Sequence, residues 1–163
     1  MPAARPWARW AVPQRCAVCL AWSPQQPCPA CTARFATRRP RCRACALPLP
    51  VAVPLCGACL LHPPPHQHAV AAVDYGFPWD GLLGRWKQGG DLSLTRVFTG
   101  LMRQALGQAD PERPEPDLVL SMPASDARLR ERGFDQAALL ARGLSARADP
   151  GLLLRWQIGR AHV

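Results

Sequence analysis

Eight cysteines are the residues of this sequence best suited to chemistry, and all of them lie between residues 16 and 59. They form four Cys-x-x-Cys pairs, with eight, ten and ten residues between successive pairs. Two residues between thiolates let a tight turn place both sulfurs on one metal ion, and two such turns complete a tetrahedral zinc site. We therefore predict two zinc ions, held by Cys16, Cys19, Cys28, Cys31, Cys42, Cys45, Cys56 and Cys59.

Four sulfurs on each ion leave no open position for water, so the two sites are predicted to be structural and not catalytic. Thioredoxin-like redox chemistry and an iron–sulfur cluster are the competing interpretations. The first needs a single Cys-x-x-Cys motif and the paired spacing is less typical of the second, so neither explains all four pairs. Short connections favour a sequential grouping of the pairs, and an interleaved grouping is the alternative.

The basic charge of the chain is concentrated beside these cysteines. The sequence carries a formal net charge of +9, and residues 1–65 contain eight arginines and no acidic residue. Thiolates bound to zinc offset only part of this charge, so a mild basic patch remains. Nucleic acid could contact a short arginine run, with three tryptophans as stacking faces: Arg38, Arg39, Arg41 and Arg43, with Trp7, Trp10 and Trp22. We favour the alternative, a solvated basic loop with aromatics in a small core.

The sequence also indicates where the protein works. No apolar stretch approaches the roughly 18 residues that a membrane span requires, and the first 14 residues lack the apolar run of a secretory signal. Paired cysteines in a reducing compartment usually hold metal. We therefore expect a cytoplasmic protein without a membrane span.

A Pro/His-rich segment over residues 61–69 is predicted to be an extended linker. His62, His66 and His68 belong to it, and we assign them no metal because four complete cysteine pairs are available. Beyond the linker, apolar residues bounded by turn residues predict a strand over 70–77. A short helix over 82–87 is then expected to end at Gly89-Gly90.

Periodic apolar residues predict two further helices. One covers residues 94–106, with Asp91 or Ser93 as its cap, and the other covers residues 136–146. Between them, residues 117–123 are predicted to form a buried strand, while residues 124–134 have too little apolar periodicity to be core. This alternation predicts an α/β layer with a parallel sheet, whose ligand sites lie beyond the carboxyl ends of the strands.

Three sequence motifs follow the cysteine pairs along the chain, in the part of the sequence after the linker. They are Trp86-Lys87-Gln88-Gly89-Gly90-Asp91, then Met122-Pro123, then Arg128-Leu129-Arg130-Glu131-Arg132-Gly133-Phe134-Asp135-Gln136. Over residues 16–147 this pattern resembles the ComF family of phosphoribosyltransferase-like proteins. The resemblance implies a double zinc ribbon joined to a type I phosphoribosyltransferase-like fold that binds phosphoribosyl pyrophosphate and Mg²⁺. It also implies a link to natural competence, with single-stranded DNA or proteins of the competence machinery as partners.

By resemblance, Lys87 could contact a phosphate oxygen, and a solvated helix end is the alternative. Arg128, Arg130 and Arg132 could form an anion-binding loop, because guanidinium groups match phosphate, and of these we select Arg132; an exposed arginine-rich loop is the alternative. Asp135 and Gln136 are expected to cap a helix.

The chain departs from the family where it has Ser121-Met122-Pro123 in place of Pro-Val-Pro. No two acidic residues are adjacent, and no Thr-Thr-Gly-like loop follows a strand, so the groups that hold the ribose and its 5′-phosphate are missing. We therefore assign no catalytic residue and expect the chain as written to be inactive.

The expected organisation has five parts. An N-terminal extension covers 1–15, the double zinc ribbon 16–60, the linker 61–69 and an incomplete phosphoribosyltransferase-like α/β domain 70–157. Residues 158–163 resemble the translation of a sequencing adapter, so we interpret them as an artefactual tail on a truncated chain. The alternative function is a non-enzymatic zinc-ribbon module that binds nucleic acid or a protein partner.

Overall fold

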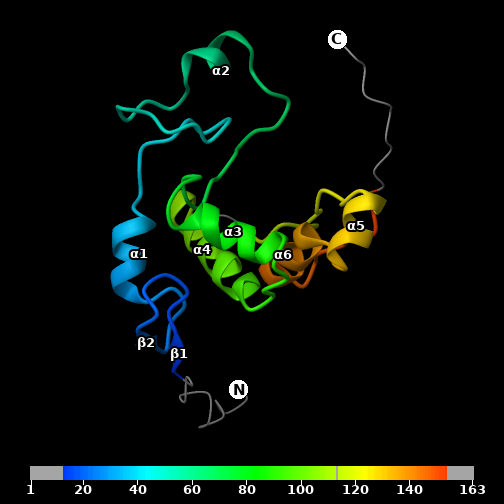
Figure 1. The fold of residues 1–163 in the computed structure, drawn as a ribbon. Coiled ribbons are helices and arrows are strands. Elements are labelled where there is room, and N and C mark those ends of the chain that lie inside the picture. Colours follow the sequence, from blue (N-terminus) through cyan, green and yellow to red (C-terminus); the bar gives the residue numbers. More distant parts are fainter. Residues whose placement is uncertain (1–12, 113, 154–163) are drawn as a thin grey trace, which may run out of the picture.

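The computed structural model describes residues 13–112 and 114–153, which form two small cysteine-rich units and a group of packed helices (Figure 1). The elements are β1 (Gln14–Arg15), β2 (Trp22–Ser23), α1 (Pro29–Phe35), α2 (Gly57–Leu61), α3 (Trp79–Lys87), α4 (Leu94–Ala109), α5 (Asp126–Arg132) and α6 (Gln136–Leu144). We call residues 14–35 the first cysteine unit and residues 41–61 the second cysteine unit. None of the described helices has the length and apolarity needed to cross a membrane. The expected adapter-derived tail, residues 158–163, lies outside the described residues.

The first cysteine unit is a two-stranded hairpin followed by a short helix. β1 pairs antiparallel with β2, so that Arg15 faces Trp22. The side chain of Gln26 joins the hairpin to the next loop, because its amide nitrogen donates to the Arg15 carbonyl and its oxygen accepts from the Ala17 N–H. α1 then begins after Cys28, with a proline in its first turn, where a missing N–H costs nothing.

The second cysteine unit repeats this backbone 26 residues later. The bridge between Arg41 and Pro48 corresponds to the pairing of Arg15 with Trp22. The Cys42 N–H donates to the Leu47 carbonyl at 2.9 Å, just as the Cys16 N–H donates to Ala21 at 2.8 Å. The two units are therefore copies of one design, although the loop before α2 is two residues longer than the loop before α1.

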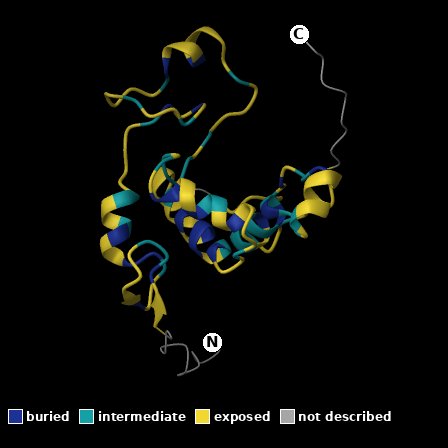
Figure 2. Ribbon diagram, in the orientation of Figure 1, coloured by how far each residue is buried: buried dark blue, intermediate teal, exposed yellow. Residues whose placement is uncertain are grey.

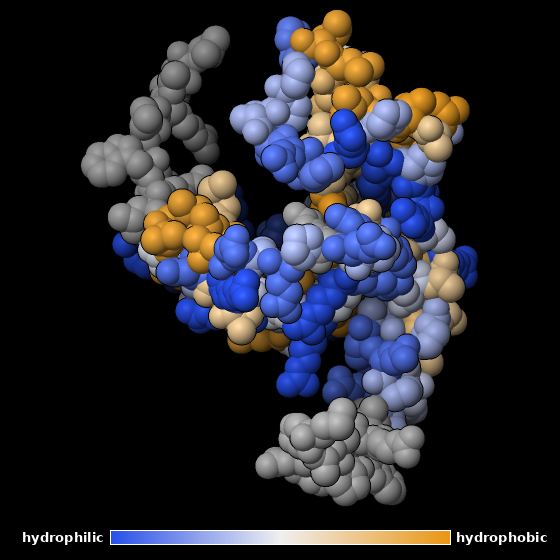
Figure 3. Space-filling model, turned by 180° about the vertical axis from the view of Figure 1, so that it is seen from behind, coloured by the Kyte–Doolittle hydropathy of each residue, from blue (hydrophilic) through white to orange (hydrophobic). Residues whose placement is uncertain are grey.

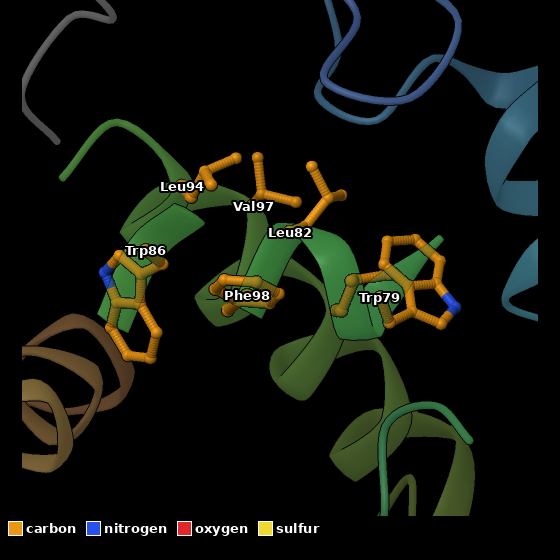
Figure 4. Packing of buried hydrophobic residues seen from close by; sticks show 7 residues of the cluster. Trp79, Leu82, Trp86, Leu94, Val97 and Phe98 are labelled. Atoms are coloured by element: carbon orange, nitrogen blue, oxygen red, sulfur yellow. The ribbon is translucent and has the colours of Figure 1, made fainter. Parts of the chain in front are cut away.

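The main hydrophobic core lies between α3 and α4 (Figure 4). Its buried residues are Trp79, Leu82, Trp86, Leu94, Val97, Phe98 and Leu101. The indole N–H of Trp86 donates to the Thr95 hydroxyl at 3.0 Å, and its ring lies 5.1 Å from that of Phe98. Gly90, at a φ of 67°, turns the chain between the two helices. The sequence prediction of both helices is confirmed, with α3 beginning three residues earlier and α4 ending three residues later than expected.

α6 also packs against α4, and buried positions are concentrated in this helical group (Figure 2). The helix begins after Asp135, whose carboxylate accepts from the Ala138 N–H at 2.9 Å and so confirms the predicted cap. α5 is a short exposed helix capped by Ser125. It has no buried residue, which agrees with the prediction that this stretch is not core. Ser93 sits at the start of α4, but its side chain makes no capping hydrogen bond.

The predicted parallel sheet does not form among the described residues. Residues 70–77 make no strand, and residues 117–123 contribute one parallel bridge between Val119 and Ala148. Isolated strands are unstable because each needs a neighbour to receive its backbone hydrogen bonds. The observed fold is therefore two cysteine units with helices and one two-stranded sheet. The phosphoribosyltransferase-like α/β layer remains a prediction from the resemblance.

Candidate metal centres

The eight cysteines gather into two groups of four in the sequential order. Cys16, Cys19, Cys28 and Cys31 form one group, Cys42, Cys45, Cys56 and Cys59 form the other, and no disulfide joins any of them. Within each group all four sulfurs lie within 4.8 Å of one another. The Sγ atoms of Cys19 and Cys28 are 3.7 Å apart and those of Cys45 and Cys56 are 3.8 Å apart.

These distances fit zinc. Zinc–sulfur bonds of about 2.3 Å in a tetrahedron separate neighbouring sulfurs by about 3.8 Å. Each group therefore has the donor set, number and spacing to hold one zinc ion. Four thiolates would complete the coordination of that ion, so its contribution would be to fold the unit and not to activate water.

Backbone N–H groups lower the pKa of the first cysteine in each group. Burial raises the pKa of the Cys16 thiol, but backbone N–H groups of Cys28, Cys19 and Val18 aim at its sulfur, and the net result is a pKa lowered to about 6. The Cys28 N–H donates to this sulfur at 3.3 Å. Cys42 behaves in the same way, since donors from Cys56, Cys45 and Ala44 outweigh burial and lower its pKa to about 6.

The pKa of the last cysteine in each group is shifted in the opposite direction. Burial and hydrogen bonds from the neighbouring thiols raise the pKa of Cys31 and of Cys59 to about 12. Without a metal, each cluster therefore stabilises a thiolate at its first cysteine and holds a proton at its last. A divalent cation would compensate the negative charge of the thiolates and displace the protons that remain on the other sulfurs.

The two groups also share a pattern of exposure. Cys19 and Cys45 are exposed, while the other six cysteines are buried. Both exposed residues close the tight turn that follows a hairpin strand, and the residues after them, Leu20 and Ala46, have positive φ angles of 63° and 61°. Side chains rarely adopt this left-handed conformation, so both turns are strained in the same way.

Lys87 and Arg132, the predicted phosphate-binding residues, lie at the ends of α3 and α5. No hydrogen bond or ion pair joins them within the described residues. Lys87 is exposed, whereas the buried Nε atom of Arg132 has no hydrogen-bond partner in the structure. The Ser121 hydroxyl and the Gln136 amide nitrogen are also buried without a partner. Sequence reasoning did not single out Ser121 as a functional residue, because one serine in an apolar run carries no motif.

One hydrogen bond joins the segment that contains Ser121 to the helix that contains Gln136. The Ala124 N–H donates to the Asp135 carboxylate at 3.0 Å, which joins residues 121–124 to the start of α6. Phosphoribosyl pyrophosphate and Mg²⁺ do not fit here, because the same carboxylate already occupies the N-terminus of α6 and no adjacent pair of acids exists in the sequence.

The arginine run lines a groove of about 1050 Å³ between the second cysteine unit, the linker and the end of α4. Arg38, Arg39, Arg41 and Arg43 all face it. Arg39 and Arg41 both pair with Asp74, at 3.4 Å and 2.7 Å. Trp22 is 73% exposed and does not line the groove, while Trp7 and Trp10 lie outside the described residues.

The predicted linker is anchored to the second cysteine unit. His66 Nε2 hydrogen-bonds to the Ala44 carbonyl at 2.6 Å, and the Ala69 N–H donates to the Arg43 carbonyl at 2.8 Å. Both accepting atoms are main-chain carbonyl oxygens, which every residue has, so no pattern of side chains in the sequence predicted these contacts. The 26-residue repeat is a signal that was available, since an arginine precedes the first cysteine of both units.

Three comparisons with known proteins add no relative: no family model, no curated protein and no solved structure matches this chain.

Proposed function

We propose that this chain is a ComF-like protein of the phosphoribosyltransferase family, held together by two structural zinc ions and linked to the uptake of DNA. The observation that carries this proposal is the pair of four-cysteine clusters that precede the helical segment. Further support comes from the order of the motifs, with Trp86-Lys87-Gln88-Gly89-Gly90-Asp91 at the end of α3 and Arg132-Gly133-Phe134-Asp135-Gln136 at the junction of α5 and α6.

Zinc content is the first test of the proposal. The purified protein in reducing buffer should contain two zinc atoms per chain by elemental analysis. Cys31→Ser and Cys59→Ser, which change equivalent ligands of the two clusters, should each reduce the content to one. Absence of zinc from the unmodified protein would remove both the metal centres and the resemblance that depends on them.

The link to DNA uptake needs a cellular test. Deletion of the gene from a naturally competent host should lower the frequency of transformation by added DNA severalfold. Growth without added DNA should be unaffected. Restoration by the unmodified gene but not by a Cys31→Ser/Cys59→Ser double variant would support a zinc-dependent role. Unchanged transformation in the deletion strain would contradict the proposal while leaving the zinc sites intact.

We infer a second candidate function, binding of single-stranded nucleic acid, from the arginine groove. Four guanidinium groups line it, and two of them are oriented by Asp74. Among the described residues no Phe, Tyr or Trp lines the groove, and His68 offers the one ring on which a base could stack there. Contacts would go mainly to phosphates, and such binding is insensitive to sequence and weakens steeply with salt.

Fluorescence anisotropy with a labelled oligonucleotide tests this second function. Arg38→Ala/Arg43→Ala should weaken binding and reduce the slope of log affinity against log salt by about 1.4, because each lost phosphate contact on a single strand contributes about 0.7. Both arginines line the groove, and neither makes an ion pair within the described residues. Arg96→Ala/Arg142→Ala removes the same charge from exposed positions of α4 and α6. An equal effect of the two double variants would show that net charge, and not the groove, binds the strand.

A further inference from the structure

The first cysteine unit is built into the helical core. Val18 and Phe35 pack against its buried cysteines and also against the core between α3 and α4. Ala17 and Ala36 pack against the same core. The apolar residues that surround the first candidate metal centre are therefore also part of the surface that covers α3 and α4.

A hydrogen bond fixes this contact. The indole N–H of Trp79, a residue only 1% exposed, donates to the Phe35 carbonyl at 2.9 Å. Phe35 ends α1, so Trp79 satisfies one of the carbonyl groups that a helix leaves without a partner. The Phe35 ring also meets Phe77 edge to face, with centroids 5.5 Å apart. Phe77 lies two residues before the start of α3.

The second cysteine unit has no comparable contact among the residues that the structure describes. Its buried cluster consists of three cysteines and Ala44, with only Leu49 and Leu55 packed against it. Three hydrogen bonds join it to the segment after α2, between Arg41 and Asp74, between Ala69 and Arg43, and between His66 and Ala44, and none of these residues belongs to the core between α3 and α4. The end of α2 is exposed, and Figure 3 shows a hydrophobic area at this end of the molecule.

We propose that zinc at the first site is coupled to the folding of α3 and α4, with Trp79 as the positioning residue, whereas zinc at the second site folds only its own unit. This inference rests on the zinc part of the proposed function and is independent of the ComF resemblance. Without zinc, only the short hairpin and a few hydrogen bonds hold the four sulfurs of residues 16–31 together, so Val18 and Phe35 are less firmly positioned. The core between α3 and α4 then loses the apolar residues of the first unit that pack against it.

Zinc binding at the first site and folding of the α3–α4 core are thermodynamically linked, so each must favour the other. If bound zinc stabilises the α3–α4 core, an intact core must raise zinc affinity at the first site by the same factor. The second site lacks this contribution. A chelator should therefore remove the two ions in separate steps, with the ion of the second unit leaving first.

Hydrogen exchange in the full chain tests the first half of the proposal. Cys31→Ser and Cys59→Ser each remove one buried ligand at the equivalent position of the two units. In zinc-containing buffer, Cys31→Ser should speed amide exchange in residues 79–87 and 94–109 by about tenfold or more, because exchange reports local opening. Cys59→Ser should leave these amides unchanged and speed exchange in residues 41–61. Equal exchange of α3 and α4 in both variants would overturn the coupling.

Chelator competition tests the reciprocal half at one site at a time, without changing a ligand of the site that is measured. In the Cys59→Ser background, where only the first site can fill, Trp79→Phe should weaken zinc binding by about tenfold. Trp86→Phe is the matched control, because Trp86 is equally buried in the same helix but donates to Thr95 instead of to the first unit. In the Cys31→Ser background neither change should affect the second site. A Trp79→Phe variant with unaltered affinity in both backgrounds would overturn the proposal, whereas a protein without zinc would remove the zinc sites themselves.

Discussion

Arg41 donates to Asp74 at 2.7 Å and thereby joins the first residue of the second cysteine unit to a residue 33 positions further along the chain. The same guanidinium donates to the Ala46 carbonyl at 3.0 Å, so it also supports the turn that carries Cys42 and Cys45. Arg39 pairs with the second carboxylate oxygen at 3.4 Å. One acidic side chain therefore anchors two of the four groove arginines.

The first prediction concerns this carboxylate. Asp74→Asn should have two effects, a faster amide exchange in residues 41–48 and a tighter binding of single-stranded nucleic acid. Exchange rises because two partly exposed ion pairs are lost, at a cost of about 0.5–1 kcal/mol. Binding tightens because a negative charge beside the groove disappears. Asp126→Asn, an equal change of charge on the exposed α5, is the control for anisotropy. Weaker binding by Asp74→Asn would mean that orientation of the arginines outweighs the repulsion.

The second prediction concerns the strained turn of the second unit. Ala46 has a φ of 61°, a conformation that costs a residue with a Cβ atom about 1 kcal/mol and costs glycine almost nothing. Ala46→Gly should therefore raise the thermal midpoint of the zinc-loaded protein and tighten zinc binding at the second site. Ala44→Gly in the same turn is the control. Ala44 is buried and is not at positive φ, so its replacement should lower both quantities.

The third prediction concerns the contact of α4 with α6. A Cβ atom on Gly143 would lie 2.8 Å from the Thr99 hydroxyl oxygen and 2.9 Å from its methyl carbon, both too close. Arg103 donates to the Gly143 carbonyl and holds the two helices at this distance. Gly143→Ala should destabilise the protein by about 1–3 kcal/mol in denaturant unfolding, as overpacking does.

Two matched variants identify the cause of that loss. Thr99→Ala removes the atoms that the new methyl group would meet, so the double variant Thr99→Ala/Gly143→Ala should recover part of the stability. Gly107→Ala lies on the exposed side of α4 with open space around it, and should stabilise the helix by about 0.5–1 kcal/mol. Equal losses from Gly143→Ala and Gly107→Ala would contradict close packing as the cause.

The sequence predicted the features that depend on local spacing. The sequential grouping of the cysteines follows from two-residue turns and short connections, and the structure has that grouping. α4 and α6 follow from apolar residues on one helical face, and the Asp135 cap follows from the side chain that precedes α6. All of these require information from only a few neighbouring residues.

Features that depend on distant partners were not predictable in this way. Residues 70–77 and 117–123 have the composition of strands, but a strand forms only where a neighbouring strand accepts its hydrogen bonds. The contact of Trp79 with Phe35 spans 44 residues and uses a main-chain carbonyl, which no sequence pattern marks. Arg41 and Asp74 are charged residues in loops 33 positions apart, and nothing in the sequence indicated that they pair.

The last prediction concerns pH and the turn between α3 and α4. Hydrogen bonds from Ser93 and then from Arg85, whose guanidinium donates at 2.7 Å, lower the pKa of the Asp91 carboxyl below its ordinary value of 3.8. A carboxyl with a lowered pKa in the folded state adds stability above the pKa of the unfolded state and loses that stability as pH falls through the folded value. Ionised Asp91 should therefore support this turn fully at neutral pH and progressively less below about pH 4.

Asp91→Asn tests this sign. The free energy of unfolding of the variant should lie below that of the unmodified protein by about 0.5–1 kcal/mol at pH 7, the range for a partly exposed ion pair. The difference should stay constant down to about pH 5 and shrink as the pH falls through the lowered pKa of folded Asp91, because both proteins then carry a neutral group at this position. A difference that does not shrink as the pH falls and Asp91 is protonated would show that the carboxylate charge does not stabilise the turn.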